Sequence, residues 1–348
     1  MTFHLAGIAR PKAPALMLDT LKEHLGEHFD IAHSDGQMTI TTEAGAMALT
    51  VDGEQLAIAL AAPSTEKLQL ARTMLAEYLF YFAGDDPLEL TWAEPPAPTA
   101  PANLHEVRVV ATESVTPHML RVKFACADVT PFIGGNMHVR LLVPPKGRPP
   151  VWPVIGEDGR IKWPDGPDSL LIRVYTIRFV DIERGEVWVD FLQHPAEGTK
   201  TPGADFARDA KPGDRAAFLG PGGGAVPEAE HIFLAGDEAA LPAIARIAGE
   251  APAGTRLTAI IEVENAFEEQ AIGGAADLDL TWLHRASADH KSLAEATREA
   301  ITGLDSETFV WIACEKGDIR DIRALLKNRQ HDRRKMYVAW YWERDSIA

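Results

Sequence analysis

An arginine, a tyrosine and a threonine stand close together at Arg173, Tyr175 and Thr176, inside a short β-branched run. On a strand, side-chain alternation sends Arg173 and Tyr175 to one face and Thr176 to the other. A guanidinium can hold a phosphate through two hydrogen bonds, and Tyr175 can stack on or hydrogen-bond to a ring system. Thr176 can donate to a ring nitrogen such as flavin N5. The three residues therefore suit a flavin, although an exposed sheet face could carry the same residues.

A second group follows along the chain. Asp190–His194 ends another predicted strand, and Gly198–Gly203 forms a Gly/Thr-rich loop ahead of the helical segment Ala204–Asp209. Backbone N–H groups in such a loop can cradle a pyrophosphate, helped by the following helix N-terminus. The glycine run at Gly220–Gly224 precedes a strand instead of linking a strand to a helix. It is therefore not a dinucleotide-binding fingerprint.

The elements that must position these residues are of two kinds. From about residue 104 to 222, β-branched runs alternate with Gly and Pro turns, which predicts an antiparallel barrel. Its strand candidates are Val107–Val110, Met119–Phe124, His138–Val143, Val174–Phe179, Val187–Leu192 and Arg215–Leu219. From about 231 to 345, strands alternate with helices, as in a doubly wound parallel sheet. The strand candidates are His231–Ala235, Leu257–Glu262, Leu278–Trp282, Phe309–Ala313 and Met336–Ala339, and the helices are Leu241–Glu250, Ser292–Thr302 and Ile319–Arg329.

A linker with four prolines lies at residues 93–103. It predicts a separate α+β domain at 1–92, followed by a barrel at 104–226 and an α/β domain at 227–348. The first domain has helix candidates at Ala13–Phe29 and from Ser64 to Phe82. Its strand candidates are Gln37–Thr42, Ala46–Val51 and Gln55–Ala61. No catalytic grouping is evident in it.

Several short motifs in order resemble the siderophore-interacting protein family, the FAD-dependent ferric-siderophore reductases, over about residues 104–345. They are Arg173–Thr176, Asp190–His194, Pro212–Asp214, Gly220-Pro221, Leu234–Glu238, Leu241–Ile244, Trp311–Glu315 and Tyr337–Trp342. The first 92 residues resemble a small uncharacterised bacterial domain (DUF2218-like). The resemblance implies a ferredoxin-reductase-like build, in which an FAD-binding barrel precedes an NAD(P)H-type domain.

The resemblance also implies roles for individual residues. The expected cofactor contacts are Arg173, Tyr175, Thr176, Asp190 and His194, with the phosphates near Gly198, Thr199 and Thr201, and with Asp237 and Trp342 on the nucleotide side. Three positions depart from the family pattern: Ala239 stands where a threonine is common, and Cys314 and Trp340 each replace a frequent glycine.

The net charge of −17 argues against nucleic acid and anionic membranes as partners. An anionic ligand would need a locally basic cleft. Between Glu315 and Asp345, nine basic and six acidic residues give a local charge of +3. Ferric siderophores are usually anionic, so the candidate substrate ligands are Lys316, Arg320 and Arg323, together with Arg140, which matches a basic position of the family. A solvated helix face would show the same alternating charges.

Several features predict a cytoplasmic protein without a metal site. There is no signal-peptide layout, no apolar run of the roughly 18 residues that span a bilayer, and only two cysteines. His24 and His28 could bind zinc, but no third ligand is evident nearby.

The expected function is reduction of ferric siderophores by FAD, with NADPH, NADH or a ferredoxin as electron donor. Fe(II) binds hard-oxygen chelators far less tightly than Fe(III), so reduction would release the iron. Two alternatives stay open. One is a general NAD(P)H:flavin or ferredoxin-type reductase of the same build, and the other is a non-catalytic siderophore-binding protein.

Overall fold

The computed structural model describes residues 1–26, 29–193 and 201–344. It divides into two compact units. The first comprises residues 1–104 and 145–170, and the second comprises residues 105–144 and 171 onward. None of the described helices is long and apolar enough to cross a membrane.

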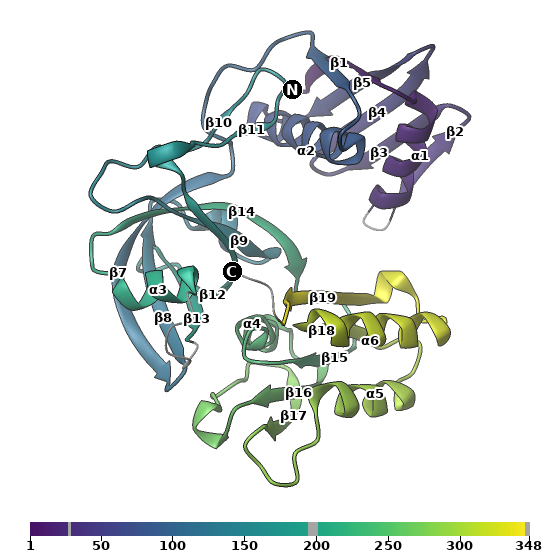
Figure 1. The fold of residues 1–348 in the computed structure, drawn as a ribbon. Coiled ribbons are helices and arrows are strands. Elements are labelled where there is room, and N and C mark those ends of the chain that lie inside the picture. Colours follow the sequence, from purple (N-terminus) through teal and green to yellow (C-terminus); the bar gives the residue numbers. More distant parts are fainter. Residues whose placement is uncertain (27–28, 194–200, 345–348) are drawn as a thin grey trace. The chain divides into compact units, whose positions relative to one another are not determined.

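The first unit is an antiparallel sheet with two helices (Figure 1). The strands, in the order β2-β3-β4-β5-β1-β6, are β1 (Phe3–Pro11), β2 (Ile31–Ser34), β3 (Gln37–Thr42), β4 (Gly45–Asp52), β5 (Gln55–Ala62) and β6 (Leu88–Trp92). Helices α1 (Pro14–Leu25) and α2 (Thr65–Ala83) contribute to the same apolar core. On α1, Leu18, Leu21 and Leu25 are buried, whereas Leu16 is 67% exposed. The predicted α+β character is confirmed, with three further strands that the sequence pattern did not reveal.

A short hairpin from the middle of the chain completes this unit. Strands β10 (Val154–Ile155) and β11 (Ile161–Lys162) lie between two barrel strands in the sequence. Trp92 donates from Nε1 to the Asp158 carbonyl at 2.8 Å, and the Arg160 guanidinium lies 3.6 Å from the centroid of the Phe80 ring. The chain therefore passes three times between the two units, at residues 104–105, 144–145 and 170–171.

The second unit begins with the predicted antiparallel barrel. Its strands close in the order β12-β13-β8-β7-β14-β9. They are β7 (Leu104–Thr116), β8 (Met119–Cys126), β9 (Asn136–Val143), β12 (Leu171–Asp181), β13 (Glu186–Leu192) and β14 (Arg215–Ala225). Helix α3 (Pro202–Asp209) packs its Phe206 against Phe124 and Phe191 of the barrel core. Strand β14 is longer than predicted because it runs through the glycine-rich segment, where Gly222 pairs with His138 of β9.

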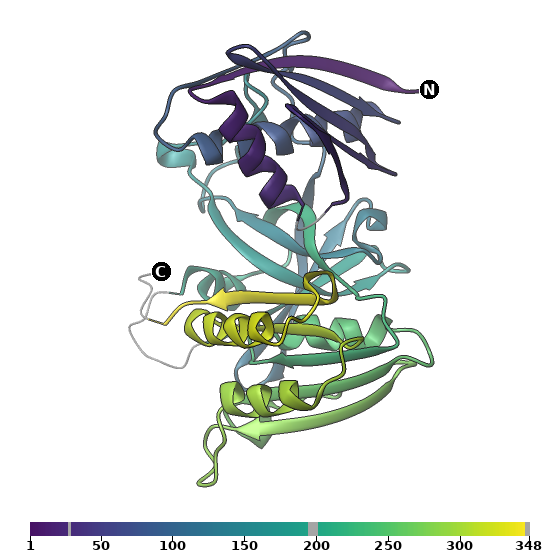
Figure 2. The ribbon, with the colours of Figure 1, turned by 90° about the vertical axis from the view of Figure 1, so that its right-hand side faces the viewer.

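The predicted parallel sheet follows, in the order β17-β16-β15-β18-β19. Its strands are β15 (His231–Gly236), β16 (Arg256–Val263), β17 (Asp277–His284), β18 (Phe309–Glu315) and β19 (Met336–Trp342). Figures 1 and 2 show α4 (Leu241–Glu250) on one face and α5 (Leu293–Gly303) and α6 (Lys316–Asn328) on the other. Helix α6 starts earlier than predicted because the Glu315 carboxylate accepts from the N–H groups of Gly317 and Asp318.

A buried arginine joins the sheet to the barrel. Arg246 of α4 is 1% exposed and donates to the carbonyl oxygens of Ile177 at 3.1 Å and Phe132 at 2.9 Å. Glu268, which precedes β17, accepts from the Thr116 hydroxyl at 2.5 Å and from the His118 N–H at 3.1 Å. These polar contacts fix the sheet against the barrel strands that carry the candidate site.

Candidate functional site

Tyr175 of β12 lies against the start of helix α3. Its ring contacts Phe191 with a centroid separation of 4.3 Å, and its hydroxyl faces Gly203 so closely that a Cβ at that position would clash with it. Burial raises the pKa of Tyr175, so the hydroxyl stays protonated at neutral pH. The glycine therefore allows the helix N-terminus to approach the strand that carries the candidate ligand residues.

No side chain of the described residues caps the N-terminus of α3. Thr201 precedes the helix, and its hydroxyl makes no capping hydrogen bond. Within the described part of the chain, the first N–H groups of the helix therefore have no side-chain acceptor, which suits a phosphate. The predicted phosphate residues Gly198 and Thr199, and the predicted cofactor residue His194, lie outside the described residues.

Arg173 is exposed on β12, and its one hydrogen bond to a described residue goes to the neighbouring carbonyl of Ile172, at 2.8 Å. No acidic side chain among the described residues forms an ion pair with it. Arg173 and Tyr175 lie two residues apart on β12, so their side chains leave the same face of the strand. The guanidinium therefore has donors available for a phosphate.

Thr176 faces the other way and enters a buried polar cluster. It pairs with His138 across β12 and β9, and its hydroxyl lies 3.3 Å from His138 Nδ1. On the other side of the imidazole, Nε2 lies 2.9 Å from the hydroxyl of Tyr341 and 3.3 Å from that of Tyr337, both on β19. Burial, with a contribution from the charge of Arg246, lowers the pKa of His138 to about 4. The imidazole is therefore neutral at physiological pH.

Asp190 is held by arginines of the barrel. Its carboxylate accepts two hydrogen bonds from Arg121, at 2.6 and 2.8 Å, and lies 4.0 Å from Nε of Arg178. The side chain of Asp190 has no exposed surface. The Asp190 carboxylate therefore holds Arg121 in place and is closed to solvent.

Asp237 and Trp342 meet at the carboxyl edge of the parallel sheet, where doubly wound sheets bind ligands. Trp342 donates from Nε1 to Asp237 at 2.6 Å, and the other carboxylate oxygen accepts from the Ala239 N–H at 3.0 Å. Burial raises the pKa of Asp237 to about 6, against the effect of the Trp342 hydrogen bond. The two residues predicted on the nucleotide side therefore contact each other.

The predicted basic residues differ in what they bind. Arg323 gives both Nε and Nη2 to the Val338 carbonyl, at 3.0 and 2.6 Å, and so secures strand β19. Lys316 is half exposed and pairs with Glu343 at 2.8 Å. Arg320 is 82% exposed, with Asp321 at 3.6 Å.

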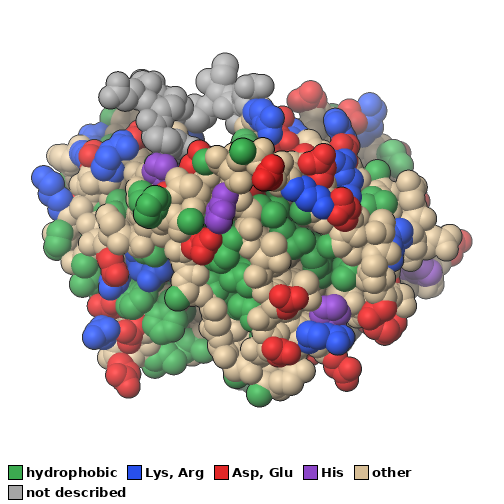
Figure 3. All heavy atoms as spheres, turned by 90° about the horizontal axis from the view of Figure 1, so that it is seen from below, with side chains coloured by type: hydrophobic (Ala, Val, Ile, Leu, Met, Phe, Trp, Pro, Cys, Tyr) green, Lys and Arg blue, Asp and Glu red, His purple; other side chains and the backbone are tan. Residues whose placement is uncertain are grey.

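Arg140 is exposed on β9, in register with Val174 of β12 and Leu219 of β14. On the face of the molecule shown in Figure 3, Lys and Arg side chains are interspersed with Asp and Glu. Between Glu315 and Asp345, Lys316 pairs with Glu343 and Lys335 pairs with Glu307, so acidic neighbours partly neutralise the local positive charge.

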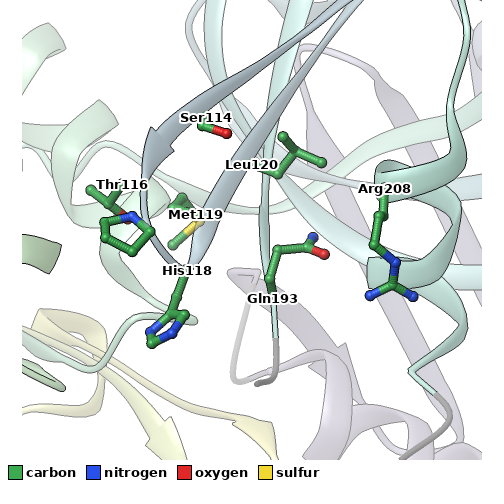
Figure 4. A pocket seen from close by; sticks show the side chains of 8 residues that line it. Ser114, Thr116, His118, Met119, Leu120, Gln193 and Arg208 are labelled. Atoms are coloured by element: carbon green, nitrogen blue, oxygen red, sulfur yellow. The ribbon is translucent and has the colours of Figure 1, made fainter. Parts of the chain in front are cut away.

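A cavity of about 330 Å³ opens at the end of the barrel near α3. Figure 4 shows the side chains of His118, Gln193 and Arg208 around it. Its walls come from the β7–β8 turn, the end of β13 and α3, and comprise Ser114, Thr116, Pro117, His118, Met119, Leu120, Gln193 and Arg208. This volume is within the range of small-ligand pockets.

Three residues of this region were not predicted as site residues: His138, Arg246 and Tyr341. His138 lies in the same strand as Arg140, and Tyr341 lies in the motif Tyr337–Trp342. The residue type of a single histidine or tyrosine does not indicate which distant residue it hydrogen-bonds to. Arg246 lies in an apolar helix, and its burial depends entirely on carbonyl groups of the barrel. Only tertiary structure reveals these contacts.

The described residues fit a flavin dinucleotide. An uncapped helix N-terminus and a free guanidinium suit phosphates, and a buried hydroxyl at the junction of barrel and sheet suits a polar ring atom. Family models agree with this fit. Residues 108–225 match the siderophore-interacting FAD-binding domain, residues 229–345 match the siderophore-interacting protein model, and residues 7–93 match an uncharacterized protein conserved in bacteria (DUF2218).

Individual relatives cover the same part of the chain. Ferric vibriobactin reductase ViuB of Vibrio cholerae is 26% identical over 242 residues, which are 68% of this chain and 88% of that protein. The structure of a siderophore utilization protein from T. fusca shows 34% identity and a TM-score of 0.59, covering 70% of this chain and 95% of that one. SipS, a siderophore-interacting protein from Aeromonas hydrophila, shows 25% identity and a TM-score of 0.56, covering 70% and 93%. The chain belongs to the siderophore-interacting protein family.

Proposed function

We propose that this protein is an FAD-dependent reductase of ferric siderophores, which releases iron as Fe(II). The name of the ViuB relative and the two family models support this activity. Bound FAD would supply the conversion of a two-electron donor into single electrons, each of which reduces one Fe(III). The protein would bind, orient and shield the reacting partners.

The observation that carries the proposal is the free guanidinium of Arg173, on the same strand as Tyr175 and Thr176 and with the uncapped start of α3 beside Tyr175. In the proposed complex, Arg173 and the α3 N-terminus near Thr201 bind the phosphates, and Tyr175 and Thr176 face the ribityl chain and ring. The cavity beside Gln193 would receive the outer part of the dinucleotide. Asp190 would act indirectly, by holding Arg121.

The ferric chelate would approach through Arg140 and Lys316, which are exposed and positively charged. Arg320 can add only long-range attraction, because it is almost wholly solvated. Arg323 would support the site through strand β19, since its donors already hold the Val338 carbonyl. The proposed electron donor is NADPH or NADH, or a ferredoxin, on the side of Asp237 and Trp342.

An anaerobic experiment tests the proposal. The purified chain is loaded with FAD and mixed in a stopped-flow instrument with NADH or NADPH, and then with a catecholate or a hydroxamate ferric chelate, while an Fe(II) indicator reports the product. We expect Fe(II) to form with at least one combination of donor and chelate. If neither nicotinamide reacts, the FAD-loaded protein is reduced chemically before it is mixed with the ferric chelate. This measures electron transfer to iron without the step from the donor.

The outcomes separate the alternatives. A chain that binds no FAD is not a flavin reductase of either kind, and binding of ferric siderophore alone would make it a binding protein. A chain that reduces free flavins or a protein acceptor but no ferric siderophore would be a general reductase.

A further inference from the structure

Two buried polar groups, Thr176 and His138, and two partly buried tyrosines form one connected chain between the barrel and strand β19. Thr176 Oγ1 lies 3.3 Å from Nδ1 of His138, and Nε2 of the same ring lies 2.9 Å from Tyr341 and 3.3 Å from Tyr337. Thr176 and His138 are each less than a tenth exposed. Unpaired polar groups at such sites are costly, so the protons in this chain must be arranged consistently.

The glycine-rich end of β14 provides the space for the imidazole. A Cβ at Gly224 would clash with Nε2 and Cδ2 of His138, and this glycine has a φ of 62°, which side-chain-bearing residues rarely adopt. Gly222 is the register partner of His138 on the neighbouring strand. The glycine run at Gly220–Gly224 therefore provides the space that the His138 imidazole occupies.

The number of protons limits the possible arrangements. Burial raises the pKa values of Tyr337 and Tyr341, so both hydroxyls keep their protons. The pKa of His138 is lowered, so its ring carries a single N–H. A chain of this kind can run in one of two directions. Either Nε2 accepts from a tyrosine and Nδ1–H donates to Thr176, or the imidazole accepts from Thr176 and donates to a tyrosine.

The surroundings of the two nitrogens favour the first direction. Nε2 lies near two tyrosine hydroxyls, each of which needs an acceptor for its proton, whereas Nδ1 lies near one hydroxyl, that of Thr176. If Tyr337 donates to Nε2, its oxygen can accept from Tyr341, and the Tyr341 oxygen can in turn accept from Thr176. Every proton on the tyrosine side then has an acceptor, and Nδ1–H is directed at Thr176.

We propose that His138 is a positioning residue whose Nδ1–H donates to Thr176 Oγ1, so that the Thr176 hydroxyl acts as a hydrogen-bond donor toward the flavin ring when it is bound. This inference rests on the proposed function only in naming the flavin as the acceptor. The histidine makes no contact with the cofactor in this assignment. It sets the direction in which the threonine hydroxyl points.

The tautomer is measured first, in the protein without added flavin. The chain is labelled with ¹⁵N-histidine, and the His138 resonances are identified by their loss in His138→Asn. We expect the proton on Nδ1, with Nε2 shifted as an acceptor nitrogen. An Nε2–H imidazole overturns the proposal, whether or not the protein binds FAD.

The effect on Thr176 is measured by the affinity for oxidised FAD. Thr176→Val and His138→Leu should each raise the Kd roughly 3- to 10-fold, as expected for one hydrogen bond. Because both remove the same hydrogen bond, the double variant should be no weaker than either single variant. His138→Asn keeps an amide N–H donor at the δ position and should stay within about twofold of the unchanged protein.

Urea midpoints of all variants show whether a change in affinity follows a loss of folded protein. Additive effects of Thr176→Val and His138→Leu, or an Asn variant as weak as the Leu variant, would overturn the positioning role. Failure of the unchanged protein to bind FAD would instead contradict the proposed function, and the tautomer measurement would still decide the state of His138.

Discussion

Two arginines associated with strand β12 differ in their burial and in their hydrogen-bond partners. Arg173 lies on the strand itself, is exposed, and donates to no described residue other than the adjacent Ile172, whose carbonyl accepts. Arg246 comes from α4, is 1% exposed, and donates to carbonyl oxygens of Ile177, Phe132 and Gly134 and to the Glu250 carboxylate. The guanidinium of Arg173 is therefore accessible to a ligand. Nearly every N–H donor of Arg246 is already hydrogen-bonded to protein oxygens.

The difference shows that the partners of a guanidinium, and not its presence near a site, decide whether it can bind an anion. Arg323 belongs with Arg246 by this criterion, because its donors hold the Val338 carbonyl. Arg140 and Lys316 belong nearer to Arg173, because both are accessible to solvent. Four measurements, in order of decreasing expected effect, test this distinction.

Replacing the buried arginine should have the largest effect. Arg246→Met keeps the apolar stem but leaves the carbonyls of Ile177 and Phe132 without donors, and we expect a loss of about 3–5 kcal/mol in the free energy of unfolding. Arg320→Met, at a position that is 82% exposed, is the matched control and should change stability by less than about 0.5 kcal/mol. Urea unfolding followed by tryptophan fluorescence measures both. A loss below about 1 kcal/mol for Arg246→Met would contradict its role as the link between sheet and barrel.

Opposed pH dependences of two buried groups should be next in size. The folded-state pKa of Asp237 is about 6 and its ordinary value is 3.8, so between these values only the folded protein binds the proton and stability falls as pH rises. The folded-state pKa of His138 is about 4 and its ordinary value is 6.5, so the unfolded chain binds the proton and stability rises with pH. Each contribution amounts to at most about 3 kcal/mol. The charge of Arg246 is part of the reason for the His138 shift.

Single substitutions separate these contributions. Relative to the unchanged protein, Asp237→Asn should become more stable as the pH rises from 4.5 to 7, and His138→Asn should become less stable. Urea unfolding at several pH values over this range gives the two differences. Two differences of the same sign would show that one of the groups is not buried as described.

The sequence predicts most of the second unit because its strands and helices have strong, regular patterns. All six barrel strands and all five parallel strands lie where runs of β-branched and other apolar residues predict them. Strand β1 was not predicted because its apolar residues are mixed with glycine, alanine and charged residues, and β2 and β6 were not predicted because they are only four and five residues long. The hairpin at 154–162 gave no signal, because its place in the first unit depends on contacts such as Trp92 with Asp158.

The candidate site was predicted only in part for a related reason. The residue types of Arg173, Tyr175 and Thr176 indicate that they could bind a phosphate or a ring system. Among the described residues, Arg173 donates only to the Ile172 carbonyl, so most of its N–H donors remain available. The sequence does not reveal that Arg323 is bound to Val338, or that His138 lies between Thr176 and two tyrosines. Those facts depend on which residues meet across 15 to 203 positions of the chain.

Removing the free guanidinium should weaken cofactor binding without unfolding the protein. Arg173→Ala should raise the Kd for FAD roughly 10- to 100-fold, the range for hydrogen bonds to a charged group, and leave the urea midpoint almost unchanged. Arg184→Ala, at an exposed position of the turn after β12, is the control for lost surface charge. Equal FAD affinity in Arg173→Ala and the unchanged protein would exclude Arg173 as the phosphate ligand.

The smallest effect is expected for the lysine that is exposed but already paired. Lys316→Glu should raise the apparent KM for an anionic ferric chelate about 2- to 5-fold, because an exposed charge in water contributes less than about 1 kcal/mol, and the Kd for FAD should not change. Lys335→Glu is the matched control, since Lys335 is also partly exposed and pairs with Glu307 at 2.7 Å. An equal rise in both variants would mean that only the total charge of the protein matters. A rise in Lys316→Glu alone, which disappears at high salt, would place the chelate near Lys316 and extend the distinction from arginines to lysines.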